Sequence, residues 1–125
     1  MIKLYTPGNY RKNHNIIKFT RSASTTDLTV VFIHGLYGTA GDRGSKLYIL
    51  GEKIHRLGVA NVAYLNSSRD WKIYKAGSEK KAFCGKTFDE ERRDILDMFR
   101  ALDERAREVF GARQKRYQIV ANSMG

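Results

Sequence analysis

The stretch that decides the fold is YQIVANSMG, residues 117–125. Its first four residues form a largely apolar run, which predicts a buried strand. Ser123 follows between Ala121 and Gly125, and small-x-Ser-x-Gly after a strand is typical of a nucleophile elbow, the sharp strand-to-helix turn that exposes a serine hydroxyl. The alternative is a serine at a strand end that caps a helix. The position directly after a strand favours Ser123 as a candidate catalytic nucleophile.

A second informative stretch is LTVVFIHGLYG, residues 28–38. Its first six residues are apolar and β-branched on both faces, which predicts a central parallel strand covered by helices on both sides. The glycine-rich segment after it allows backbone N–H groups to point into a site. It matches neither Gly-x-x-x-x-Gly-Lys-Ser/Thr nor Gly-x-Gly-x-x-Gly, so it is not a phosphate loop of those kinds. Taken alone, His34 is more typical of a structural histidine than of a base.

The chain outward from these stretches alternates strands with helices, which indicates an α/β sheet. Residues 2–5 and 16–20 are expected to form an antiparallel pair of strands, and residues 61–65 a further parallel strand. Between the two parallel strands, Leu47, Leu50, Ile54 and Leu57 recur at helical spacing, and Gly58 follows as a stop. We expect Gly51, inside this helix, to mark close packing against a strand.

The best helix pattern in the chain begins at Thr87. Thr87 and Glu90 have the spacing of a capping box. An apolar stripe runs from Phe88 to Val109, and Gly111 follows it. The pattern therefore predicts one helix over about 87–110, directly before the strand that leads to Ser123.

The composition is that of one domain, or part of one: 125 residues, 42% hydrophobic and 29% charged, with no apolar run long enough to span a bilayer. Eight of the thirteen acidic residues lie in 89–108, so the net charge of +10 is concentrated elsewhere. This charge could serve a nucleic acid, a membrane or an anionic substrate. Because the basic residues are scattered, we favour an ordinary solvated surface. Cys84 is the only cysteine, and with no secretory signal at the N-terminus we expect a cytoplasmic protein.

The two motifs together are more specific than either alone. A His-Gly loop after an early strand, with an elbow about 85–90 residues later in a strand–helix alternation, resembles the α/β-hydrolase family over nearly the whole chain. The resemblance implies an α/β-hydrolase core with a mostly parallel sheet and flanking helices. It also implies that Ser123 is the nucleophile and that the backbone N–H groups of Leu36 and Met124 form the oxyanion hole. In the family, residues at the positions of His34 and Gly35 shape the loop.

Two departures from the family pattern matter. Ala121 replaces the commoner glycine at the first elbow position, which is tolerated because alanine is small. In the family the triad acid and histidine follow the nucleophile, whereas His14, His34 and His55 all precede Ser123. We therefore interpret residues 1–125 as the N-terminal part of a single hydrolase domain, inactive without the C-terminal portion that carries those residues.

A third segment, residues 67–75, follows a predicted parallel strand and mixes aromatic with basic residues. Sites in open α/β sheets form at this end of the strands, so Asp70 and Trp71 are candidates for substrate contact. A nucleic-acid surface would use the same residue types. A partly packed surface loop is at least as good an interpretation. Asp70 does not fit the triad acid, which the family places much later.

The function that this resemblance implies is that of a serine hydrolase acting on carboxylic esters through an acyl-enzyme. Thioesterase, amidase, peptidase and acyltransferase chemistry use the same parts. The expected partner is a small-molecule ester or other acyl substrate; no metal or organic cofactor is implied, and nucleic acid is not expected. The competing class is a non-catalytic domain of the same fold that uses the basic loop to hold an anionic or nucleic-acid partner.

Overall fold

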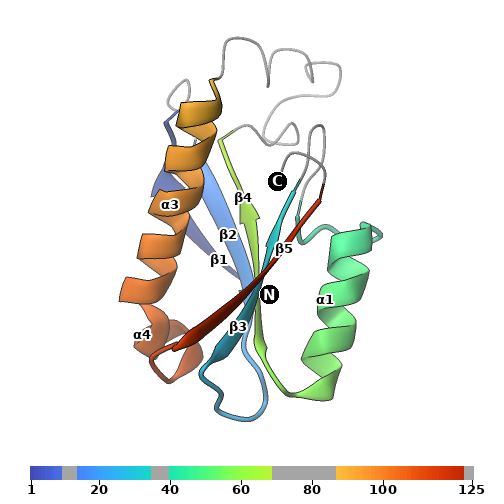
Figure 1. The fold of residues 1–125 in the computed structure, drawn as a ribbon. Helices are drawn as coiled ribbons and strands as arrows, with labels where there is room; N and C mark the ends of the chain where they lie inside the picture. The colour runs from blue at the N-terminus through green and yellow to red at the C-terminus, as the bar shows by residue number, and fades with distance from the viewer. Residues whose placement is uncertain (10–13, 35–39, 69–86, 123–125) are drawn as a thin grey trace.

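The fold is described from a computed structural model, in which residues 1–9, 14–34, 40–68 and 87–122 are described. The described elements alternate between strand and helix after two opening strands (Figure 1). In chain order they are β1 (Ile2–Pro7), β2 (His14–Thr20), β3 (Leu28–Ile33), α1 (Lys46–Leu57), β4 (Asn61–Asn66), α3 (Phe88–Glu104), α4 (Ala106–Phe110) and β5 (Arg116–Ala121).

The strands form one mixed five-stranded sheet in the order β1-β2-β4-β3-β5. β3 runs parallel to β4 on one side and to β5 on the other, which confirms the predicted central position of the strand ending at Ile33. β1 and β2 form the expected antiparallel pair, and β2 is antiparallel to β4. The fold class is therefore α/β, with three parallel strands whose carboxyl ends meet at one edge of the sheet.

The helices lie on opposite faces of the sheet, as Figure 1 shows for α1 and α3. One core lies under α3 and α4 and is built around Ile17, Val31 and Leu65. The other lies under α1 and is built around Phe32 and Tyr64. Because successive strand residues point to opposite faces, β3 and β4 supply apolar side chains to both cores, and this explains their nearly unbroken apolar sequence.

The N-cap of α1 is Ser45, whose hydroxyl accepts the N–H of Tyr48, and its C-cap is Gly58 in the left-handed conformation. The predicted close packing at Gly51 is confirmed, because a Cβ there would lie 1.9 Å from the Tyr64 hydroxyl. The predicted apolar face is partly wrong. Leu50 and Leu57 are 42% and 72% exposed. The helix packs on the sheet through the face that contains Gly51, and these two leucines lie outside this contact between helix and sheet.

The N-cap of α3 is Thr87, whose hydroxyl accepts the N–H of Glu90, as the capping pattern predicts. The single predicted helix is wrong in two respects: it breaks at Arg105 into α3 and α4, and Phe88 is 75% exposed. The buried apolar positions on this segment recur every four residues, at Met98, Leu102, Ala106 and Phe110. Steps of four drift by about 40° each around an ideal helix. The break keeps the last two on the core.

Candidate active site at the carboxyl edge of the sheet

The carboxyl ends of the parallel strands bring distant parts of the sequence together. Ile33, the last residue of β3, is in register with Leu65 of β4 and with Ala121 of β5. One residue further, the N–H of Asn122 donates to the carbonyl of Ile33 at 3.3 Å. The residue before His34 and the residue before Ser123 are therefore joined by a hydrogen bond at this edge.

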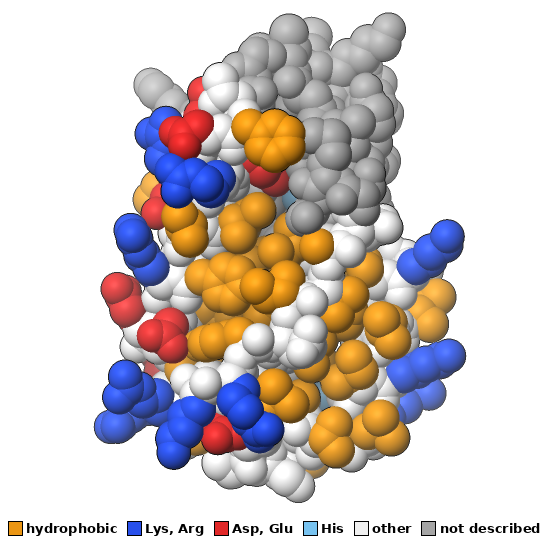
Figure 2. All heavy atoms as spheres, in the orientation of Figure 1, with side chains coloured by type: hydrophobic (Ala, Val, Ile, Leu, Met, Phe, Trp, Pro, Cys, Tyr) orange, Lys and Arg blue, Asp and Glu red, His pale blue; other side chains and the backbone are white. Residues whose placement is uncertain are grey.

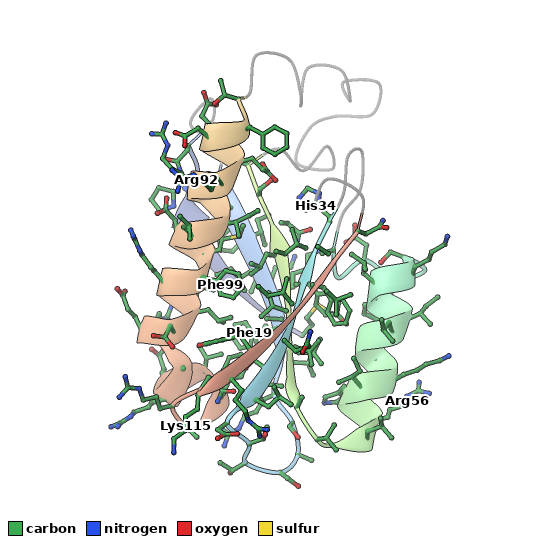
Figure 3. The ribbon with its side chains drawn as sticks, viewed as in Figure 1. Phe19, His34, Arg56, Arg92, Phe99 and Lys115 are labelled. Carbon is green, nitrogen blue, oxygen red and sulfur yellow. The ribbon has the colours of Figure 1, made fainter. Side chains whose placement is uncertain are left out.

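His34 lies at the end of β3 and is 1% exposed. Its position at the carboxyl edge, beside the end of β5, is seen in Figure 3. Its Nε2 accepts the backbone N–H of Ser67 at 3.3 Å, and the Ser67 hydroxyl lies 3.4 Å from the same nitrogen. A backbone N–H can only donate, so Nε2 is the unprotonated nitrogen, its lone pair accepts the Ser67 N–H, and the ring proton of a neutral imidazole is on Nδ1.

The far end of the glycine-rich segment is fixed to the same part of β4. The N–H of Ala40 donates to Oδ1 of Asn66 at 2.7 Å, and the Asn66 amide donates to the carbonyl of Ile16 at 3.4 Å. Gly41 follows with φ of 78°, and a Cβ there would meet the Tyr64 side chain at 3.0 Å. His34 and Ala40 are thus both bound to consecutive residues at the end of β4.

A second polar cluster lies beside this one and surrounds the buried carboxylate of Asp94 on α3. The N–H and the side-chain amide of Asn9 donate to its Oδ1 at 2.7 and 2.9 Å. Ser68 donates its N–H to Oδ2 at 3.2 Å and its hydroxyl to the same oxygen. Asn15 accepts the Ser68 N–H as well, at 2.8 Å. These bonds connect Asn9 after β1, the end of β4 and α3 at this edge of the sheet.

Two groups with shifted pKa values take no part in the hydrogen bonds described above. At the amino ends of β3 and β5, the hydrogen bond from Arg116 holds the pKa of Asp27 below its ordinary value. Burial, with a contribution from Glu52, raises the pKa of Tyr64 in the core. Within the parts of the chain that the structure describes, no group of three or more His, Cys, Asp or Glu side chains could hold a metal ion. No described helix is long and apolar enough to cross a membrane.

Most of the predicted site residues fall outside the described residues: Ser123, Leu36, Met124, Gly35, Asp70 and Trp71. His34 is the predicted site residue that the structure places. Of the other two histidines, His14 is exposed at the start of β2, and His55 lies on α1 with Nε2 3.2 Å from the carbonyl of Arg21. Neither of these two histidines takes part in the hydrogen bonds described above for His34.

The sequence analysis missed the role of Asn66, Ser67 and Ser68. It assigned them to a loop that contacts substrate or packs partly on the surface, whereas all three are buried and bind neighbouring segments. A signal was present. Three short polar side chains directly after the apolar run 62–65, at the edge where the other motifs end, are well suited to bind backbone N–H groups.

Comparisons with known proteins bear on the fold of the chain. No protein-family model matches the sequence, and no curated protein matches it. The structure is similar to solved structures of hydrolases, and its fold is α/β-hydrolase-like.

One similar structure is an alpha-beta serine hydrolase homologue from Coxiella burnetii, with a TM-score of 0.58 and 12% identity. Another is the siderophore hydrolase EstB from Aspergillus fumigatus, with a TM-score of 0.54 and 15% identity. The alignments cover 98% and 97% of this chain, but only 52% and 32% of the two solved chains. This chain therefore spans about half and about a third of their lengths.

Proposed function

We propose that this chain carries the nucleophile and oxyanion hole of a serine hydrolase that acts on carboxylic esters. Ser123 would attack the acyl carbonyl, and the N–H groups of Leu36 and Met124 would stabilise the oxyanion. The observation that carries the proposal is the hydrogen bond from Asn122 to Ile33. It joins the residue that precedes Ser123 to the strand that leads, within three residues, to Leu36.

The contacts of His34 support a loop-shaping role for His34 and Gly35. The bonds from Ser67 to His34 and from Ala40 to Asn66 hold both ends of the glycine-rich segment on β4. Anchored flanking residues support the proposal because oxyanion donors stabilise a transition state best when they are already oriented.

The complete reaction needs more than these residues. A histidine would take the proton of Ser123, an acid would orient that histidine, and water would release the acyl group. We place both residues after Ser123, so residues 1–125 alone are expected to be inactive. Asp70 and Trp71 are proposed to contact the small acyl substrate. The single cysteine, Cys84, is consistent with the cytoplasm as the compartment.

The described residues contain a rival serine–histidine pair, Ser67 and His34, 3.4 Å apart. Two observations argue against it as the catalytic pair. Both side chains are 1% exposed, so a substrate carbonyl would not reach the hydroxyl. Nε2 already accepts the Ser67 N–H, so the lone pair that a general base needs is occupied.

Ester hydrolysis distinguishes the roles of Ser123 and Ser67. It is measured with p-nitrophenyl acetate and butyrate on the protein as its gene encodes it. Ser123→Ala should lower kcat/KM by at least about 10³-fold. The matched variant Ser67→Ala keeps the backbone N–H that binds His34, so it should retain most of the activity. Loss of activity in Ser67→Ala with an active Ser123→Ala would contradict the proposal.

A further inference from the structure

A groove of about 380 Å³ lies on the α1 side of the sheet, next to strands β1 and β2. Its lining includes Lys3, Lys18, Arg43, Tyr48, Glu52 and His55. The volume is within the range of sites for small molecules, about 300–1,000 Å³. None of the residues that carry the candidate active site is among its described lining residues.

The sheet register places two lysines side by side in this groove. Lys3 of β1 is paired with Lys18 of β2, so both side chains leave the same face. Lys18 lies close to Gly41, where a Cβ would meet its side chain at 3.1 Å. This identifies the shared face as the α1 side. Like charges directly opposite each other across two strands are destabilising unless a counter-ion is present.

Among the residues that the structure describes, one of the two lysines has an ion-pair partner. Lys18 forms an ion pair with Asp42 at 2.6 Å. Within the described residues, Lys3 and Arg43 have no ion pair, and neither does Glu52. With Asp42 neutralising Lys18, two unpaired cations face one unpaired carboxylate, so the groove has a positive charge that the described chain does not balance.

We propose that this groove binds a phosphate-bearing small molecule, with Lys3 and Arg43 as the groups that hold the anion. Charge-assisted hydrogen bonds from both would satisfy several phosphate oxygens at once. The anion would also place a counter-charge beside Lys3, since Asp42 is paired with Lys18. Tyr48 offers an aromatic wall for the rest of the ligand, because it lines the groove and stacks on Tyr64 with ring centroids 6.2 Å apart.

The test uses inorganic phosphate and pyrophosphate as probes, titrated by calorimetry into the protein as its gene encodes it. The double variant Lys3→Gln/Arg43→Gln should bind pyrophosphate at least tenfold more weakly. The matched control is Arg100→Gln/Arg107→Gln, which removes the same charge from exposed positions on α3 and α4, on the other face of the sheet. The control should bind as the unchanged protein does.

A second arm asks whether the phosphate comes from a free ligand or a lipid headgroup. Flotation with phosphatidylcholine vesicles, with and without phosphatidic acid, separates the two. Vesicle binding that needs phosphatidic acid and is lost in Lys3→Gln/Arg43→Gln would assign the site to headgroups; pyrophosphate binding without vesicle binding would assign it to a free ligand. No binding of any probe at millimolar concentration, or equal weakening in both double variants, would overturn the proposal.

Discussion

β4 and β5 both run parallel to β3, one on each side, and yet they have opposite surroundings. All six residues of β4 are buried. In β5 four residues are exposed and two are half-buried, and Ile119 is 50% exposed. Figure 2 shows apolar side chains gathered on the face where Figure 1 places β5. Within the described residues β5 pairs with β3 alone, so its outer backbone groups form an edge of the sheet.

The difference teaches that an apolar run does not determine its own burial. Residues 61–65 and 117–120 both predict buried parallel strands from sequence. β4 is buried because β2 and β3 flank it and a core lies on each of its faces. β5 has a neighbour on one side only. Unpaired, partly apolar edges are the surfaces through which sheets associate with other strands.

The largest expected effect is a loss of stability at a buried position of β4. Leu65→Ala should lower the free energy of unfolding by about 2–5 kcal/mol, because it leaves a cavity in a fully buried site. Ile119→Ala on β5 should cost less than about 1.5 kcal/mol, since half of the side chain is already exposed. Urea unfolding of both variants measures the contrast, and equal losses would contradict it.

The packing between α1 and β4 gives the next largest effect. Gly51→Ala should destabilise by about 1–3 kcal/mol, although alanine favours helix by about 1 kcal/mol. The new Cβ would overlap the Tyr64 ring, which is fully buried and stacked on Phe32, so the ring has no room to move. In a Tyr64→Leu background the same substitution should no longer destabilise. A cost of similar size in both backgrounds would show that the overlap is not its cause.

The exposed edge of β5 should make the 125-residue chain self-associate. Ile119→Lys places a charge on the edge strand and should shift the chain toward the monomer in size-exclusion chromatography and sedimentation. Leu57→Lys is the matched control, because Leu57 is more exposed but lies on α1. A monodisperse monomer with strongly protected amides in residues 117–120 would refute this prediction.

The smallest effect is the pH dependence at the start of β5. The Arg116 guanidinium holds the pKa of Asp27 below its ordinary value of 3.8, so the folded protein keeps this carboxylate ionised to lower pH than the unfolded chain does. The stabilisation is fully present above the unfolded-state value and is lost as the pH falls through the lower folded-state value. Unfolding followed from pH 6 to pH 2 should therefore show a slightly flatter acid limb in Asp27→Asn. If the two proteins lose stability equally between pH 6 and pH 2, the bond between Asp27 and Arg116 does not contribute to the pH dependence.

Part of the fold can be predicted from local patterns: the apolar runs and the helices between them indicated the antiparallel pair of opening strands and the central position of the strand ending at Ile33. Local patterns could not predict the break at Arg105 or the exposure of Leu50, Leu57 and Phe88, since these depend on where each helix meets the sheet. At the site, the resemblance identified His34, but the partner that fixes it is Ser67, 33 residues away. Such a contact exists only after β3 and β4 pair. The short polar residues after β4 indicate that they bind backbone or side-chain groups, but not that His34 is the partner of Ser67.

The central claim is that Ser123 is the nucleophile. It follows Asn122, whose N–H donates to the carbonyl of Ile33. Labelling of the protein as its gene encodes it with a fluorophosphonate, followed by peptide mass spectrometry, tests this claim most directly. The account predicts one adduct, on Ser123, absent after Ser123→Ala and retained after Ser67→Ala. An adduct on Ser67, or no adduct in protein that circular dichroism shows to be folded, would contradict it.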